Sequence, residues 1–165
     1  MNKEEILKQV GFDLEKAKQI HAWLNETPCN QVTAPSSPDD IITIVEQNGL
    51  KFVRVHSGKY DFCVDLHDAP NEMNWDDAMK WAEDKGMRLF TIEEGLLMYC
   101  FKDEINAKLK EAGGDELRED EYQWSSTEGN RTYARSVTFY NGYAGTYSKT
   151  CGYVVRPVAA FSCVS

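Results

Sequence analysis

The sequence has no apolar run that approaches the roughly 18 to 20 residues needed to cross a bilayer. Its beginning, MNKEEILKQVGFDLEKAKQI, alternates charged and apolar residues and lacks the apolar core of a secretory signal peptide. We therefore expect synthesis in the cytoplasm without export by the general secretory route, and no insertion into a membrane.

Metal-binding and redox motifs are also missing. The five cysteines are an odd number and none belongs to a C-x-x-C pair, so we expect reduced thiols in a chain without a secretory context. Cys151 and Cys163 are the two that adjacent strands would bring together, and whether they pair is left open. His21, His56 and His67 lack the i, i+4 spacing of a zinc site. The sequence predicts no metal, no cofactor and no catalytic residue.

The chain has fewer basic residues than acidic residues. The chain has 18 Lys and Arg against 27 Asp and Glu, which gives a formal net charge of -9. Such a charge repels a phosphate backbone, so we expect no nucleic acid partner. The hydrophobic content of 42% and the aromatic content of 12% are those of a folded protein, and 165 residues fit one domain with an attached N-terminal element.

The N-terminal region differs in pattern from the rest of the chain. Between residues 3 and 26, apolar side chains recur at spacings of three and four, which predicts an amphipathic helix or two. Residues 27–40 are rich in Pro, Ser and Asp, as is typical of a linker. We predict an N-terminal helical extension and linker at 1–39 and a domain at 40–165. Residues 1–26 would pack on that domain, mediate homo-oligomerisation or dock to a carrier.

The domain begins with strand patterns and continues with helix patterns. The β-branched runs at 41–45, 51–55 and 60–66 predict strands, and Asn48-Gly49 predicts a tight hairpin between the first two. Asn74 then predicts the cap of a helix that ends near Gly86. Thr91 and Glu94 form a capping box for a second helix, which is predicted to run through Leu109 to Gly113-Gly114.

The last part of the domain is predicted to be entirely β. Short runs at 122–127, 133–140, 143–147 and 153–161 are rich in aromatic and β-branched residues. Strands, two helices and then more strands predict an α+β fold rather than a parallel sheet.

Two segments carry the most specific motifs: NWDDAMKWAEDKGMRLFTIEE at 74–94 and YQWSSTEGNRTYARSVTFYNGYAGTYSKTCGYVVRPVAAF at 122–161. They resemble the two halves of a C-type-lectin-like domain, in the bacterial and phage branch that includes the variable proteins of diversity-generating retroelements and, more distantly, formylglycine-generating-enzyme-like domains. The resemblance covers about residues 40–161 and implies a C-type-lectin-like fold with mixed or antiparallel sheets, two helices and the N-terminal extension outside it. Its most specific parts are Trp124-Ser125-Ser126-Thr127, Phe139-x-Asn141-Gly142 and Val155-Arg156-Pro157-Val158.

The sequence also departs from these families. Leu89-Phe90-Thr91 stands where the family often has Leu-Pro-Thr. The cysteine pair that binds copper in formylglycine-generating enzymes has no counterpart at the right spacing, and the Glu-Pro-Asn, Gln-Pro-Asp and Trp-Asn-Asp motifs of calcium-dependent lectins are absent. The resemblance therefore implies neither copper oxidase activity nor a calcium site.

In the retroelement-diversified proteins, a mutagenic reverse transcriptase replaces template adenines, so that Asn codons give rise to Tyr, Ser, Thr, Gly, Arg, Cys and others. The resemblance implies that ligand contacts lie between Glu128 and Tyr153, beside a fixed framework that includes Trp124, Phe139, Arg156 and Pro157. The residues predicted to bind the ligand are Asn130, Arg131, Tyr133, Arg135, Tyr140, Tyr143, Thr146, Tyr147, Ser148 and Thr150.

The tyrosines of this segment allow two interpretations. Tyr133, Tyr140, Tyr143 and Tyr147 alternate with Gly, Ser and Thr, which is the composition of antibody paratopes. An ordinary two-layer sheet, in which alternate tyrosines pack inward, accounts for the same pattern.

From these observations we expect a non-catalytic receptor- or adhesin-type module that binds a protein or a surface glycan, associated with a virion or a cell surface. Two alternatives stay open. One is an enzyme of the formylglycine-generating type, which would require a metal or a reactive cysteine pair. The other is a structural virion or cell-surface component without a variable ligand.

Overall fold

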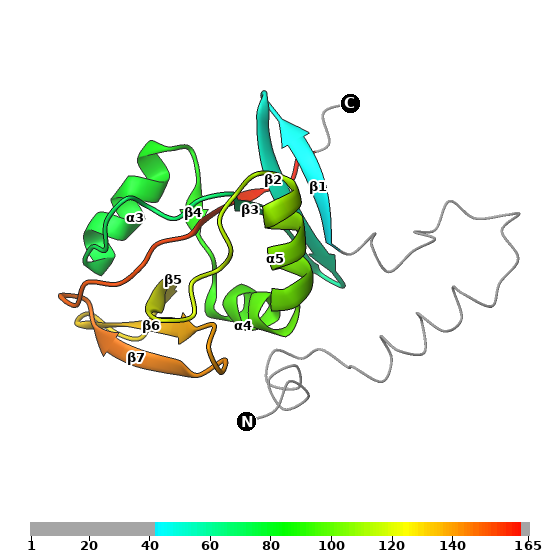
Figure 1. Cartoon of the computed structure of the whole chain (residues 1–165). Coiled ribbons are helices and arrows are strands. Elements are labelled where there is room, and N and C mark those ends of the chain that lie inside the picture. The colour runs from blue at the N-terminus through cyan, green and yellow to red at the C-terminus, as the bar shows by residue number, and fades with distance from the viewer. Residues whose placement is uncertain (1–41, 163–165) are drawn as a thin grey trace, which may run out of the picture.

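The computed structural model describes residues 42–162, which form an α+β fold with three helices and two antiparallel sheets (Figure 1). The larger sheet has the strand order β1-β2-β3-β8-β4, and the smaller sheet has the order β5-β6-β7. The larger sheet consists of β1 (Ile42–Gln47), β2 (Leu50–Ser57), β3 (Tyr60–Asp65), β4 (Arg88–Leu89) and β8 (Pro157–Ala160). The smaller sheet consists of β5 (Tyr122–Glu128), β6 (Tyr133–Thr138) and β7 (Ala144–Ser148), and the helices are α3 (Trp75–Asp84), α4 (Ile92–Cys100) and α5 (Lys102–Glu111).

The first hairpin forms where Asn48-Gly49 predicts it. These residues have φ angles of 52° and 78°, the left-handed values that a two-residue turn requires and that glycine adopts without a Cβ clash. Gln47 pairs with Leu50 directly across the turn, so the turn sets the register of β1 and β2.

Both predicted helix starts are confirmed. The Asn74 side chain accepts a hydrogen bond from the Asp77 amide at 2.9 Å at the start of α3. At the start of α4, Thr91 Oγ1 accepts from the Glu94 amide at 3.2 Å, and Glu94 Oε2 accepts from the Thr91 amide at 2.8 Å. These caps satisfy amides that the first helical turn leaves without partners.

The prediction of one helix from Thr91 through Leu109 is wrong, and with it the prediction of two helices in this domain. The helix breaks at Phe101, which has φ -103° and ψ 23° and ends α4 just before α5 begins. The two pieces cover different sheets: α4 packs on β5 and β6, while α5 packs on β1 and β2. A straight helix cannot follow two sheets that diverge, so tertiary packing overrides the continuous local pattern.

The predicted strand at 153–161 is also too long. Only its second half, from Pro157, forms β8, and β8 pairs with β3 and with the unpredicted short strand β4. Before β8 the chain makes single bridges, from Tyr153 to Met73 and from Val154 to Gln123. This extended stretch therefore joins β5 to the loop before α3 instead of continuing a sheet.

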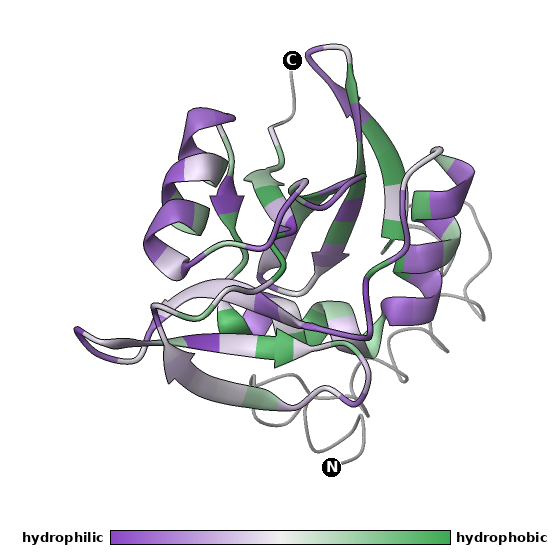
Figure 2. Cartoon of the chain, turned by 60° about the vertical axis from the view of Figure 1, so that its left-hand side comes forward, coloured by the Kyte–Doolittle hydropathy of each residue, from purple (hydrophilic) through white to green (hydrophobic). Residues whose placement is uncertain are grey.

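Buried apolar residues form two clusters. The larger lies among β1, β2, β3, β8, α4 and α5 and includes Phe62, Leu97 and Ile105. The smaller lies between α3 and the smaller sheet and includes Trp75 and Trp124. Figure 2 shows hydrophilic residues over much of α3, whose buried residues are Trp75, Ala78 and Ala82. The smaller sheet is thus anchored by α3 as well as by α4.

Several predictions fall outside the described residues: the N-terminal helical extension, the boundary between residues 39 and 40, and Cys163. Within residues 42–162, none of the helices has the length and the apolar character that a membrane span requires.

Candidate ligand-binding face

The register of β6 and β7 divides the predicted binding residues between two faces of the smaller sheet. Residues directly opposite each other on paired strands share a face, and successive residues alternate between faces. Tyr133 pairs with Ser148, and Arg135 pairs with Thr146. We call this face the polar face and define it by these four residues.

The opposite face, which we call the packed face, carries Ala134 paired with Tyr147 and Ser136 paired with Gly145. β5 extends it, because Trp124 pairs with Ser136 and Tyr122 pairs with Thr138. The two faces therefore separate Tyr133 from Tyr147, although both strands carry the same kinds of residue. The packed face is formed by Tyr122, Trp124, Ala134, Ser136, Gly145 and Tyr147.

Aromatic rings cover the packed face. The Tyr147 ring centroid lies 4.7 Å from that of Tyr122 and 5.4 Å from that of Tyr153, and Trp124 lies 4.7 Å from Tyr153. Burial raises the pKa of the Tyr147 hydroxyl above its ordinary value and raises that of Tyr153 to about 12. A Cβ at Gly145 would lie 2.4 Å from the Tyr147 ring, so this glycine makes room for the ring.

The polar face is less covered. Tyr133 is 44% exposed and Thr146 is exposed, while Arg135 and Ser148 are half-buried. The Nε atom of Arg135 is buried and has no hydrogen-bond partner among residues 42–162. An unsatisfied buried donor costs about 1–3 kcal/mol, so the guanidinium favours any acceptor that reaches it. Towards the β6–β7 turn, the same side of the sheet continues as Val137 and Ala144 and joins the larger core cluster.

Three predicted residues lie at the end of the sheet where the β5–β6 loop and the end of β7 meet. Asn130 Oδ1 accepts hydrogen bonds from the amides of Thr132 at 2.8 Å and Tyr133 at 3.0 Å, which shapes the loop. Arg131 is exposed in that loop. Thr150 is exposed beyond β7, and its Oγ1 lies 2.9 Å from Ser148 Oγ. Asn130 and Thr150 thus adjoin the end of the polar face at which Tyr133 pairs with Ser148.

Tyr140 and Tyr143 lie at the opposite end, on the turn between β6 and β7. They are 71% and 50% exposed, and the Asn141 side chain holds the turn by accepting from the Tyr143 amide at 3.0 Å. The length of β6 separates this turn from Tyr133 by about 17 Å, at about 3.3 Å per residue. A ligand that touches both ends must therefore be at least the size of a peptide segment.

The residues predicted to form a framework are buried. Trp124, Phe139 and Arg156 have no exposed surface, and Pro157 is buried. Arg156 Nε donates to Asp68 Oδ1 at 2.6 Å, and its terminal nitrogens donate to the backbone carbonyls of Asp65, Asp115 and Glu116. Burial raises the pKa of Asp68, and the positive charge of Arg156 opposes that rise. One guanidinium thus joins the segment that ends β3 to the loop after α5, directly before β8.

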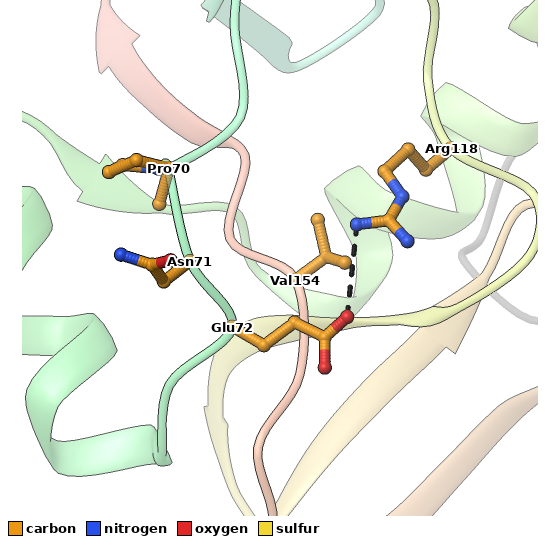
Figure 3. A pocket seen from close by; sticks show the side chains of 6 residues that line it. Pro70, Asn71, Glu72, Arg118 and Val154 are labelled. Carbon is orange, nitrogen blue, oxygen red and sulfur yellow. Dashed lines mark ion pairs between the residues drawn. The ribbon is translucent and has the colours of Figure 1, made fainter.

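A separate hollow of about 400 Å³ lies away from the predicted residues, between the loop before α3 and Arg118 (Figure 3). Its charged lining is Glu72 and Arg118, whose side chains form an ion pair at 3.8 Å. The rest of the lining is Ala69, Pro70, Asn71 and Val154, so none of the lining residues is a nucleophile or a histidine base.

Two of the described histidines and cysteines, His67 and Cys63, have clear local environments. His67 Nδ1 lies 2.8 Å from Asp115 Oδ2 on the surface, and this contact lowers the pKa of Asp115. Cys63 is buried, and burial raises the pKa of its thiol to about 11, which leaves almost no thiolate at neutral pH. Among residues 42–162, no three His, Cys, Asp or Glu side chains are grouped as metal ligands would be.

Comparison of the sequence with known protein families and with curated proteins finds no match. The candidate site is therefore defined by its geometry alone. The sequence pattern named the exposed residues of the polar face, but it did not separate them from Tyr147 or reveal the packing of Tyr122 and Tyr153. Side chains alternate between faces along a strand, so positions 133 and 135 lie on one face of β6 and positions 134 and 136 on the other. This alternation is the sequence signal that separates the two faces.

Proposed function

We propose that this chain is a non-catalytic binding module of the C-type-lectin-like kind, which holds its ligand on the polar face of the smaller sheet and the adjoining loop and turn. The observation that carries the proposal is the contrast between the buried framework residues and the exposed, Tyr-containing surface on β6, β7 and the turn between them. The mechanism is association without turnover.

The chemistry of the surface supports binding. Tyr133, Tyr140 and Tyr143 are among the exposed large hydrophobic side chains in the described residues. Tyrosine gives a large and stiff contact at low entropic cost, and the neighbouring Asn, Ser and Thr side chains supply adaptable hydrogen bonds. A protein surface fits these residues because they are spread along a strand and a turn rather than gathered in a cavity.

The resemblance to retroelement-diversified proteins adds a second part to the proposal, which is that the surface varies. The positions expected to vary differ in how much space the surrounding structure leaves for a new side chain. Arg131, Tyr133 and Tyr143 are exposed and tolerate change, whereas Gly145 and Tyr147 pack against each other and restrict it. Diversity would therefore concentrate on the exposed positions, in a module carried by a virion or a cell surface.

The proposal is tested by binding of the full chain to arrays of surface proteins and glycans. We expect the Tyr133→Ser and Tyr143→Ser variants to lose binding by about tenfold, which corresponds to about 1.4 kcal/mol. Leu50→Ser is the matched control, because Leu50 is 63% exposed at the start of β2, in the larger sheet. Binding that persists unchanged in both tyrosine variants would contradict the proposal, as would stoichiometric copper held by the cysteines of the purified chain.

A further inference from the structure

The acidic residues of this chain are distributed very unevenly. All 27 Asp and Glu residues lie at or before Glu128, and residues 129–165 contain none. The later part still carries the basic residues Arg131, Arg135, Lys149 and Arg156. A protein with a net charge of -9 thus has a β6–β7 region without a single carboxylate side chain of its own.

The arginines of the chain differ in whether they have a carboxylate partner. Four of the six arginines have carboxylate partners: Arg54 with Asp61, Arg88 with Glu94, Arg118 with Asp120 and Arg156 with Asp68. Arg131 and Arg135 are the remaining two, and neither makes an ion pair with any residue in 42–162. Lys149, the nearby lysine, is already paired with Glu128 and lies over the Trp75 ring.

These two arginines belong to the same surface as the exposed Tyr133. Arg131 lies in the β5–β6 loop and Arg135 on the polar face, with Tyr133 between them along the chain. Among residues 42–162, the buried Nε of Arg135 has no acceptor. A guanidinium fork matches a carboxylate in geometry as well as in charge, and the pair of hydrogen bonds is stronger than those between neutral groups.

From this juxtaposition we infer that the surface binds an acidic segment of a partner protein, with Asp or Glu side chains seated on Arg131 and Arg135 beside Tyr133. The inference rests on the proposed function and names the partner chemistry for the same surface. An extended surface that continues from a loop along a strand fits a polypeptide segment better than an isolated acidic sugar.

The experiment uses the full chain and an immobilised array of synthetic peptides. Each acidic peptide is matched by one in which Asn and Gln replace Asp and Glu, and sialylated and uronate-containing glycans are placed beside them. Arg131→Gln and Arg135→Gln are the test variants. Arg118→Gln is the control, because it makes the same change of charge on an arginine that already has carboxylate partners. Unchanged urea midpoints verify that the variants fold.

We expect the chain to bind acidic peptides but not their amide counterparts, and each test variant to weaken that binding at least tenfold while Arg118→Gln does not. Equal binding of acidic and amide peptides that only Tyr133→Ser weakens would overturn this inference and leave the proposed function in place. Binding to acidic glycans alone would overturn it likewise. If no probe binds the wild-type chain, the inference fails, and the protein and glycan arrays decide the proposed function separately.

Discussion

Both faces of the smaller sheet carry tyrosine, but in opposite environments. Tyr147 lies on the packed face among the rings of Tyr122 and Tyr153, whereas Tyr133 lies on the polar face with nearly half of its surface exposed. Tyrosine in a β-rich segment is therefore evidence neither for binding nor for packing. The register of the strands decides which of the two roles each tyrosine can take.

Two arginines show a similar contrast between a buried and a half-buried environment. Arg156 is completely buried and makes hydrogen bonds to one carboxylate and three carbonyl oxygens, whereas Arg135 is half-buried and its Nε has no acceptor. The hydrogen bonds of Arg156 are all made within the fold, whereas the Nε of Arg135 has no acceptor among residues 42–162. The contrast can be tested by comparing matched variants of the two groups.

The largest expected effect is on the framework arginine. Replacing Arg156 by Met leaves Asp68 buried without its counter-charge and three carbonyls without donors, and we expect a loss of about 3–5 kcal/mol in the free energy of unfolding. Arg135→Met is the matched control, with an expected change within about 1 kcal/mol, because its Nε loses no hydrogen bond. Urea denaturation measures the free energy of unfolding of both variants. Similar losses in the two variants would contradict the distinction between a framework arginine and a surface arginine.

Gly145→Ala should have a smaller effect. The added methyl meets the Tyr147 ring, so the ring must move from Tyr122, and we expect a loss of about 1–3 kcal/mol. If this clash is the cause, the Gly145→Ala change should cost much less in a Tyr147→Ala background. A double-mutant cycle by urea denaturation checks this, and strictly additive losses would show that the two residues do not restrict each other.

The packed tyrosines should also make stability depend on alkaline pH. The pKa of Tyr153 is raised to about 12 from 10, mainly by burial, so between those values the unfolded chain has lost a proton that the folded chain retains. Stability is therefore fully present below pH 10 and falls as the pH rises towards 12. Tyr153→Phe should show a shallower decline in the midpoint of urea denaturation. An identical decline in both proteins would mean that Tyr153 is not held in its neutral form by the fold.

The smallest expected effect is on the polar face. Tyr133→Ser and Thr146→Ala remove exposed side chains, and we expect each to change the free energy of unfolding by no more than about 0.5 kcal/mol. A loss above 2 kcal/mol, which is about the value for a buried side chain, would place these residues in the framework.

Local signals in the sequence predicted much of the fold. Asn48-Gly49 located the first hairpin, and Asn74 and Thr91 located the starts of two helices, because turns and caps depend on neighbouring residues. The break at Phe101 was not predictable in this way. The apolar residues on both sides suit one long helix, and only the need to cover two sheets separates α4 from α5.

The candidate site was predictable as a segment but not as a surface. Composition and resemblance named residues on both faces, since the segment from 130 to 150 has one character throughout. Which residues share a face follows from the pairing of β6 with β7. That Arg131 and Arg135 form no ion pair within residues 42–162 depends on where distant carboxylates lie in the fold.

The most direct test of a fixed framework under a changeable binding surface is to sequence codons 120–160 from many cells or virions of the source population. The account predicts substitutions at Arg131, Tyr133, Tyr140, Tyr143, Thr146 and other exposed positions, with Trp124 and Arg156 invariant and Gly145 and Tyr147 changing rarely or together. Substitutions spread equally over the packed and polar faces, or a uniform sequence, would contradict it.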